Sequence, residues 1–496
     1  MKLNTLFNAL FLFISSAFAG YQYEEIELPL HVDPQIGGLA TLPNGNIIAC
    51  FHRGEVMIYD VKSKEWSLFA EGLHEPLGIV ALSNSEFMVM QRPELTKLID
   101  TDQDGQADKY ETFFDGFGMT GNYHEFSFGP VMDKAGNFYI SLNVASNGAS
   151  IRKEVRGEFI DIGMKREKFY SVESKNWKSI KKDAGRMYSR VPYRGWVLKI
   201  SPEGKMIPIS SGVRSPNGLG FDAHENLYVP DNQGDWLGTS KIHLIKPGRF
   251  HGHPASLVWR KDWDGRDPLE VPVKELDAMR TKAAILSPQG IIANSLTQPI
   301  LIDHKNFGPY KGQMLIGEMN FKKILRFIPD EVNGTIQGPI FSHLENDPMK
   351  IGNNRMTWGK DGSLFIGRTK LSWAGDRGIT KVTWDGKVDF DIQNFKLSKK
   401  GFDITFTKKV HLPESENLKI TNYHYLYHSS YGSPKTDETT NLIKAIRPSS
   451  DGKTLHLELD QLTKGKVYEF SFDGIKSKSG ESLKIDKICY TLNELK

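Results

Sequence analysis

Side chains suited to chemistry are concentrated in residues 193–254, where they occupy the turns between short apolar runs. Runs such as WVLKI, NLYVP and KIHLI are typical of consecutive antiparallel strands. A sheet needs few polar side chains in its turns. In a rigid β scaffold, binding and catalytic side chains are commonly found where strands meet turns. The segment therefore predicts a binding or catalytic site. Its polar and aromatic turn residues are Arg214, Asn217, Asp231, Asn232, Gln233, Asp235 and Trp236.

An acidic loop, DTDQDGQADKYE, extends from Asp100 to Glu111. Carboxylates stand at loop positions one, three, five, nine and twelve, a glycine at six, and a glutamine that offers its carbonyl at seven. Ca²⁺ prefers oxygen ligands in this order. The apolar flanks indicate strands, so the loop predicts a structural calcium site on a β-hairpin, with a solvated acidic hairpin as the alternative. The predicted ligands are Asp100, Asp102, Asp104, Gln106, Asp108 and Glu111.

Three histidines lie in positions that suggest chemistry. His124 precedes the apolar run FSFGP, where an imidazole could act as a general base at the start of a strand. A structural hydrogen bond is the alternative role for a histidine at such a place. His251 and His253 share the i, i+2 spacing of metal ligands, but no third ligand stands near them, which favours a packed turn.

Basic side chains recur near the predicted turns of the later repeats. Converging cations suit a polyanionic cofactor or an acidic sugar, whereas scattered surface cations need no function. The residues concerned are Arg214, Lys322, Lys323, Arg326, Arg355 and Arg368.

The elements that must position these groups form a repeating unit. An apolar strand, a Gly- or Asn-containing turn and a second apolar strand recur six times, starting near Gly38, Gly78, Phe126, Asn217, Lys311 and Arg355. A small antiparallel sheet cannot bury both faces alone, so radial stacking is expected. The pattern predicts an all-β fold, a six-bladed β-propeller over residues 20–392, whose last blade the strand near Tyr23 to Leu28 completes.

Other segments depart from this repeat. Residues 151–190 and 259–281 interrupt it, and the first of these segments is rich in Lys and Arg. The first segment could form a basic lip that binds an anionic substrate, or it could be a solvated insertion in the third blade. Residues 397–496 alternate apolar and polar side chains, which predicts a small immunoglobulin-like β-sandwich with a packing or substrate-presenting role.

The first residues resemble a secretory leader. Lys2, an apolar run from Leu6 to Ile14, and the Ala-Phe-Ala sequence ending at Ala19 predict a signal peptide over residues 1–19 and a secreted or periplasmic protein. The run is too short to span a bilayer, and the formal charge of +3 argues against nucleic acid as a partner. Cys50 and Cys489 are expected to be buried and unbridged.

Several motifs together resemble the glucose/sorbosone dehydrogenase superfamily of secreted six-bladed propellers, in the branch described as membrane-bound dehydrogenases. The likeness extends from about Ile36 to Lys387. The motifs that carry it are GNYHEFSFGPVMDKAGNFYISLN, PYRGWVLKISPEGKMIPISSGVRSPNGLGF, DNQGDW, FHGHP and DGSLFIG.

The resemblance implies a cofactor and roles for several residues. In this superfamily, pyrroloquinoline quinone lies over the funnel of the propeller, held by cations and Ca²⁺, and a histidine takes the proton of the sugar hydroxyl. His124 matches that histidine and Arg214 a cofactor-holding arginine, although Ser215 stands where the pattern has Asn. Gln233 and Gly234 match the carbonyls that hold calcium. Further implied cofactor contacts are Asn217, Lys322 or Lys323, and Arg368.

These inferences predict an exported, quinone-dependent sugar or aldose dehydrogenase that uses a carbohydrate substrate and an external electron acceptor. Two alternatives remain open at this point. In a calcium-dependent lyase or hydrolase of acidic glycans, His124 would be the base and Arg214 the group that neutralises a uronate. A propeller without catalytic activity would bind glycans or proteins only.

Overall fold

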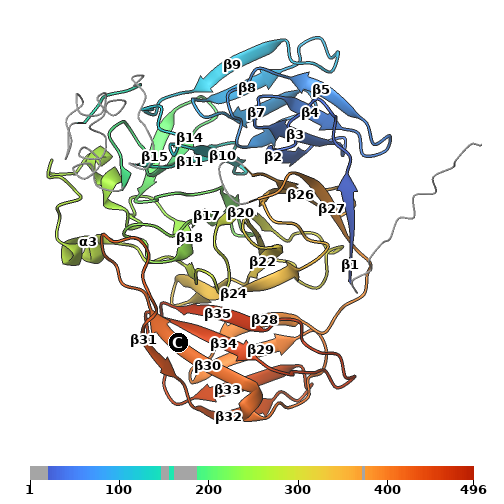
Figure 1. Ribbon diagram of the computed structural model, residues 1–496, viewed down its shortest axis with the longest axis vertical. Helices are drawn as coiled ribbons and strands as arrows, with labels where there is room; N and C mark the ends of the chain where they lie inside the picture. The colour runs from blue at the N-terminus through green and yellow to red at the C-terminus, as the bar shows by residue number, and fades with distance from the viewer. Residues whose placement is uncertain (1–19, 147–155, 161–186, 371–374) are drawn as a thin grey trace, which may run out of the picture.

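The short apolar runs form antiparallel strands because their side chains are buried on both faces, as in IIACF, whose five residues are all buried. The computed structural model describes residues 20–146, 156–160, 187–370 and 375–496. Nearly all regular structure in these ranges is strand (Figure 1). The prediction of an all-β chain is confirmed. No helix in the described ranges is long and apolar enough to cross a membrane.

Three sheets follow one another in the first half of the chain. The first contains β2 (Ile36–Thr41), β3 (Ile47–Phe51), β4 (Val56–Tyr59) and β5 (Trp66–Ala70). The second contains β6 (Ile79–Ala81), β7 (Glu86–Met90), β8 (Leu95–Ile99) and β9 (Lys109–Phe114). The third contains β10 (Ser127–Met132), β11 (Phe138–Leu142), β14 (Trp196–Ile200) and β15 (Met206–Ser211), and a separate pair, β12 (Ala145–Ser146) and β13 (Met187–Tyr188), lies between β11 and β14 in sequence.

Three more sheets continue the series. The fourth contains β16 (Gly220–Phe221), β17 (Leu227–Asp231), β18 (Ser240–Ile245) and β19 (Ile285–Ser287), with η2 (Pro254–Trp259) and α3 (Val273–Met279) between its last two strands. The fifth begins with β20 (Leu296–Leu301), β21 (Met314–Glu318), β22 (Lys323–Phe327) and β24 (Thr335–Glu345), which β23 (Asp330–Val332) joins. The sixth contains β25 (Asn353–Trp358), β26 (Leu364–Arg368), β27 (Gly378–Trp384) and β1 (Tyr21–Ile26).

The sheets lie side by side around an axis, and the first strand of each packs against the first strands of its neighbours. The approach is close enough to require glycine: a Cβ on Gly78 would lie 1.9 Å from the carbonyl oxygen of Gly129 in the next sheet. β1 pairs with β27 along its whole length, from Tyr21 opposite Trp384 to Ile26 opposite Ile379. The predicted completion of the last sheet by an N-terminal strand is therefore confirmed.

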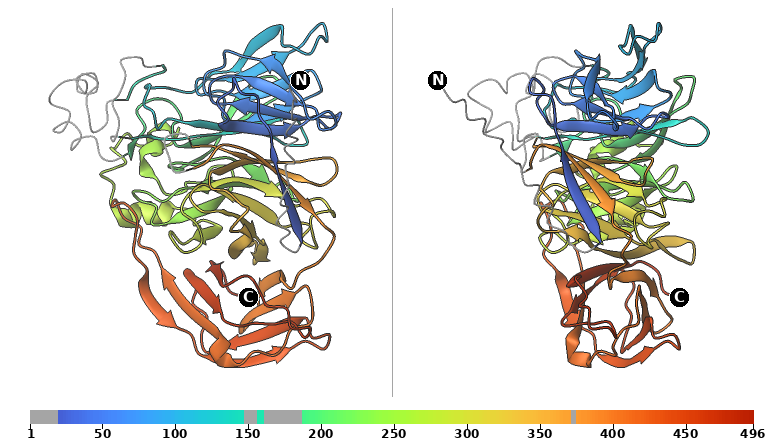
Figure 2. Two further views of the ribbon diagram at one scale, coloured as in Figure 1. Left: turned by 45° about the vertical axis from the view of Figure 1, so that its right-hand side comes forward. Right: turned by 90° about the vertical axis from the view of Figure 1, so that its right-hand side faces the viewer.

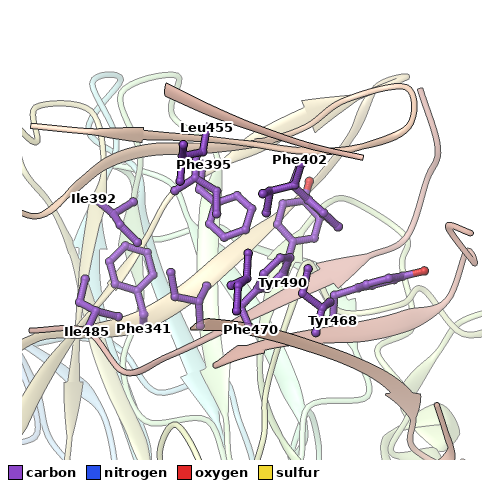
Figure 3. Packing of buried hydrophobic residues seen from close by; sticks show 14 of the residues in the cluster. Phe341, Ile392, Phe395, Phe402, Leu455, Tyr468, Phe470, Ile485 and Tyr490 are labelled. Atoms are coloured by element: carbon purple, nitrogen blue, oxygen red, sulfur yellow. The ribbon is translucent and has the colours of Figure 1, made fainter. Parts of the chain in front are cut away.

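A two-layer unit of strands lies below the ring (Figures 1 and 2). One layer contains β28 (Ile392–Leu397), β29 (Gly401–Phe406), β33 (Thr454–Leu459) and β32 (Ile443–Pro448). The other contains β35 (Lys487–Leu492), β34 (Lys466–Phe472), β30 (Leu418–His424) and β31 (Thr436–Thr440), and η3 (Ser415–Asn417) precedes β30. Aromatic side chains fill the space between the layers, among them Phe395, Phe402, Phe470 and Tyr490 (Figure 3).

The ring and the two-layer unit share a sheet. β35 pairs with β24, the outer strand of the fifth sheet, so that one sheet of nine strands runs through both parts. Arg326 reinforces the junction from the ring side, donating to a carboxylate oxygen of Asp391 at 3.0 Å and to the Ile392 carbonyl at 2.6 Å. This continuity fixes how the C-terminal strands face the ring.

Both cysteines, Cys50 and Cys489, are buried and unbridged, as the sequence predicted. The predicted leader, residues 1–19, lies outside the described residues. So does most of the basic insertion predicted over residues 151–190, of which only residues 156–160 and the segment from 187 onward are described.

Candidate active site

A cavity of about 320 Å³ opens where the first strands of several sheets begin. Its wall combines aromatic rings with amide side chains and carries few charges. The aromatic residues of the wall are Tyr123, Phe126, Phe128 and Tyr431. The amide residues are Asn143, Asn217, Asn232, Gln233, Gln289, Asn294 and Asn354. Two histidines, His52 and His124, and one arginine, Arg214, complete the titratable part of the described wall.

His124 lies in the turn just before β10 and lines the cavity. Its Nδ1 lies 2.7 Å from the Val144 carbonyl oxygen, which can only accept, so Nδ1 carries the proton. Nε2 is then the acceptor nitrogen, and the hydroxyl of Ser215 lies 3.5 Å from it. Burial, and then repulsion from Arg214, lowers the pKa of His124 to about 4. At neutral pH the ring is uncharged and keeps a basic nitrogen.

Arg214 lies in the connection between β15 and β16 and is held by a buried acid. Its Nε donates to a carboxylate oxygen of Asp235 at 2.9 Å, and its Nη1 to the Gln233 carbonyl at 3.2 Å. The other carboxylate oxygen of Asp235 lies 3.3 Å from His253 Nε2. Burial alone would raise the pKa of Asp235, but His253 and Arg214 outweigh it and hold the pKa at about 2. The charge of Arg214 is therefore neutralised inside the protein.

A second buried acid, Asp231 at the end of β17, fixes the backbone of the same connection. Its two carboxylate oxygens accept from the backbone N–H groups of Arg214 at 2.9 Å and Ser215 at 2.7 Å. Burial would raise the pKa of Asp231, but His243 and Lys241 outweigh burial and lower it. The turn that carries Arg214 and Ser215 is thus tied to a sheet strand, which gives the cavity wall a rigid edge.

Arg355, in β25, lies beneath the cavity and orients one amide of its wall. Its Nη1 donates to Asn217 Oδ1 at 3.0 Å, which turns the amide nitrogen of Asn217 away from the arginine. Its Nε and Nη2 donate to the Leu77 carbonyl. Within the described ranges Arg355 has no carboxylate partner. Burial lowers its pKa to about 10, so it stays charged at neutral pH.

Two amide oxygens of the wall, Asn143 Oδ1 and Asn232 Oδ1, are buried and have no hydrogen-bond partner among the described residues. An unmade hydrogen bond on a buried oxygen costs about 1–3 kcal/mol. Both oxygens are acceptors with almost no exposed surface, so a hydroxyl donor of a ligand would reach them only after the surrounding side chains move. With its amide side chains and aromatic rings, the wall as a whole suits a neutral polyol such as a sugar.

One part of the wall was not expected from the sequence. Tyr431 comes from the connection between β30 and β31 in the C-terminal unit, where the sequence indicated no site residue. Its backbone forms a bridge with Asp235, and the next residue, Gly432, donates its N–H to the Gly234 carbonyl at 2.9 Å. The pairing is between residues nearly two hundred positions apart, so no local pattern could have revealed it.

The structure brings some of the predicted site residues together and places others elsewhere. His124, Arg214, Asn217 and Gln233 all line the cavity, and Gly234 lies directly behind it. The remaining predicted cofactor contacts, all of them cations, do not line it in the described wall. Lys322 is exposed and pairs with Asp347, Lys323 pairs with Glu345, and Arg368 pairs with Glu25.

The positions of these cations decide whether the cavity can hold pyrroloquinoline quinone and its calcium ion. Pyrroloquinoline quinone carries three carboxylates, which need cations or converging donors. Among the described residues the wall offers only Arg214, already neutralised by Asp235. The Gln233 carbonyl predicted to bind calcium accepts from that same guanidinium, whose charge repels Ca²⁺, and the Gly234 carbonyl accepts from Gly432. The described residues therefore do not fit a calcium-bound quinone at this turn.

The acidic loop lies apart from the cavity, between β8 and β9. Carboxylate oxygens of Asp100, Asp102 and Asp108 lie within 4.8 Å of one another. Asp104 instead accepts from the backbone N–H of Gln106 at 2.8 Å, and Glu111 lies within β9 and pairs with Lys109. The structure thus groups three of the five carboxylates predicted to bind calcium, and the predicted contribution of the Gln106 carbonyl stays a prediction.

Comparisons with known proteins agree with the fold. A family model described as a domain of unknown function, DUF7133, matches residues 59–197. No curated protein matches the chain in sequence. The quinone-bound aldose sugar dehydrogenase of Streptomyces coelicolor is 13% identical, with a TM-score of 0.50 over 74% of this chain and 99% of that one. An oxidoreductase of Thermus thermophilus described as a glucose dehydrogenase is 17% identical, with a TM-score of 0.49 over 73% and 100%.

The chain therefore shares the β-propeller fold of the Streptomyces enzyme. The resemblance to the glucose/sorbosone dehydrogenase superfamily that the motifs carry is confirmed at the level of the fold. Fold alone does not determine the reaction, so the chemistry depends on the residues of the cavity.

Proposed function

We propose that the protein is an exported sugar oxidoreductase that binds an aldose in the cavity and removes a hydroxyl proton with His124. The observation that carries the proposal is geometric: His124 Nδ1 lies 2.7 Å from the Val144 carbonyl oxygen, and the ring lines a cavity walled by aromatic and amide side chains. A general base must be unprotonated and within reach of the proton that it removes. With a pKa of about 4, this imidazole meets the first condition but is a weaker base than one that titrates near neutrality.

The residues of the cavity wall have different roles in the proposed reaction. The proton of the reacting hydroxyl passes to His124 Nε2. The two electrons of the adjacent C–H bond require a hydride acceptor, which the described residues do not themselves supply. Asp235 lies near enough to favour the imidazolium that forms, which partly offsets the repulsion from Arg214. The amide side chains of the wall bind other hydroxyls of the sugar and hold it in place. The described wall lacks free charge partners for the carboxylates of the quinone.

The proposal includes the architecture and the calcium ion. Residues 20–392 form one closed six-bladed propeller and residues 397–496 an immunoglobulin-like sandwich, and residues 1–19 are a cleaved leader. The loop of Asp100, Asp102 and Asp108 binds Ca²⁺ in a structural role, since hard carboxylate oxygens at this spacing suit that ion.

A second candidate function is favoured by the shortage of free cations among the described residues that line the cavity. A propeller that binds neutral glycan ends without turnover needs the amide and aromatic wall but no electron acceptor. The lyase alternative has less support, because Asp235 neutralises the arginine that a uronate carboxylate would need.

One experiment tests the proposal against the second candidate. The mature protein is titrated with a panel of neutral aldoses by calorimetry, and dye reduction is then measured with and without added pyrroloquinoline quinone and Ca²⁺. Aldose binding with aldose-dependent dye reduction supports the oxidoreductase. Binding without reduction under either condition supports the glycan-binding function, and no binding of any sugar refutes both.

A further inference from the structure

The C-terminal unit reaches the cavity through the connection between β30 and β31, residues 425–435, which rises beside the ring near α3 (Figure 1). This connection docks on the turn after β17 by backbone hydrogen bonds. Gly432 donates to the Gly234 carbonyl and Ser433 to the Gly238 carbonyl, both at 2.9 Å. The unit thus closes one side of the site that the ring provides.

Side chains lock the same connection in place. The ring of Tyr427 packs 5.5 Å from that of Trp236, its hydroxyl donates to the Gly252 carbonyl at 2.6 Å, and Arg280 lies 4.5 Å above it. A Cβ on Gly238 would lie 2.9 Å from the side chain of Ser433, so the contact leaves no room for a larger residue. A connection held by both backbone and side chains keeps its exposed residues in fixed positions.

Tyr431 is the residue that this docking presents to the cavity. It lines the wall, it is 48% exposed, and the guanidinium of Arg214 lies 5.5 Å from its ring centre. An aromatic ring fixed at the side of a cavity lined with amides offers an apolar surface to one ligand face, while the amides bind hydroxyls. The C–H face of a pyranose is a surface of that kind.

We propose that Tyr431 is a substrate-binding residue, and that the C-terminal unit completes the sugar site by stacking this ring on the pyranose. The inference rests on the proposed function and extends it to a residue from another part of the fold. It makes the substrate class a pyranose with an accessible apolar face, such as the end of a neutral glycan chain.

The test compares Y431A, Y431F and Y431W with the unsubstituted protein. Because the ring is half exposed, Y431A should fold normally, weaken aldose binding about tenfold and raise KM equally, with kcat changed by less than about threefold. Y431F and Y431W, which keep a ring, should bind within about threefold of the original. Y110A, which removes a tyrosine with 46% exposure on β9 outside the cavity wall, is the matched control and should change neither constant.

Each result distinguishes the inference from the proposed function. If Y431A binds aldoses as tightly as the unsubstituted protein while His124→Asn abolishes turnover, the oxidoreductase stands and the role of Tyr431 is refuted. If Y431F and Y431W weaken binding as much as Y431A does, stacking is refuted as the cause. If the unsubstituted protein binds no sugar, the proposed function and the inference fail together.

Discussion

Replacement of Asp235 by asparagine would remove the carboxylate that neutralises Arg214 in the cavity wall. The two side chains are almost fully buried, 3% and 7% exposed, and Nε lies 2.9 Å from the carboxylate oxygen. Asparagine keeps the size and one oxygen that can accept from Arg214, while its amide nitrogen faces His253 Nε2, which accepts when the ring carries its proton on Nδ1. What remains is a buried guanidinium without a counter-ion, beside His124, whose protonation it disfavours.

The expected loss follows from that burial. Removing one partner of a buried ion pair destabilises a protein by about 3–5 kcal/mol. The unfolding entropy of a chain of this length is about 1 kcal/mol per kelvin, so Tm should fall by about 3–5 °C. Differential scanning calorimetry of D235N and the unsubstituted protein at neutral pH measures both quantities. Freeing the guanidinium should also improve the binding of acidic sugars relative to neutral ones.

An exposed pair of the same chemistry supplies the control. Asp262 accepts from Arg260 at 2.8 and 2.9 Å but is 70% exposed, and such pairs contribute about 0–1 kcal/mol. D262N should therefore lower Tm by less than about 1 °C. Equal shifts for D235N and D262N would refute the argument that burial makes Asp235 the necessary partner of Arg214.

Three further predictions follow from the site. The His124 base must be uncharged, and its pKa is lowered to about 4, so kcat/KM should be constant above that pH and fall below it; an acid limb centred near 6.5 would contradict the burial argument. K322A should leave aldose and quinone affinity unchanged in calorimetric titrations, because Lys322 is exposed, pairs with Asp347 and lies outside the cavity wall; weakened quinone binding would restore its predicted role. Saturating Ca²⁺ at about 100 times Kd should raise Tm by about 2–3 °C relative to chelator, and D102N should abolish the rise; an unchanged Tm would show that the acidic loop is only solvated.

Much of the fold follows from the sequence because the repeating unit is local. Each pair of strands and its turn are encoded within about twenty residues, and burial of the strands leaves few ways to assemble them. The same locality placed His124, Arg214, Asn217 and Gln233 correctly at one cavity. All four stand where strands of neighbouring sheets begin or end, and the ring brings those positions together.

The features of the site that the sequence could not predict depend on contacts between residues far apart in the chain. Lys323 and Arg368 look like free cations in sequence, but Glu345 and Glu25 reach them from other strands and neutralise them. Asp235 does the same to Arg214, and only the folded connection reveals that the guanidinium donates to the Gln233 carbonyl that was predicted to bind calcium. Tyr431 enters the cavity because β35 extends the fifth sheet, a pairing that no local pattern predicts.

The central claim, that His124 acts as a base on a bound aldose, is tested most directly by His124→Asn. The amide nitrogen of asparagine can still donate to the Val144 carbonyl, as Nδ1 does at 2.7 Å, but no basic nitrogen replaces Nε2. Aldose affinity should stay within about threefold, while aldose-dependent dye reduction falls by about 10²–10⁴-fold, the usual contribution of a general base. Dye reduction by this variant at the rate of the unsubstituted protein would contradict the account.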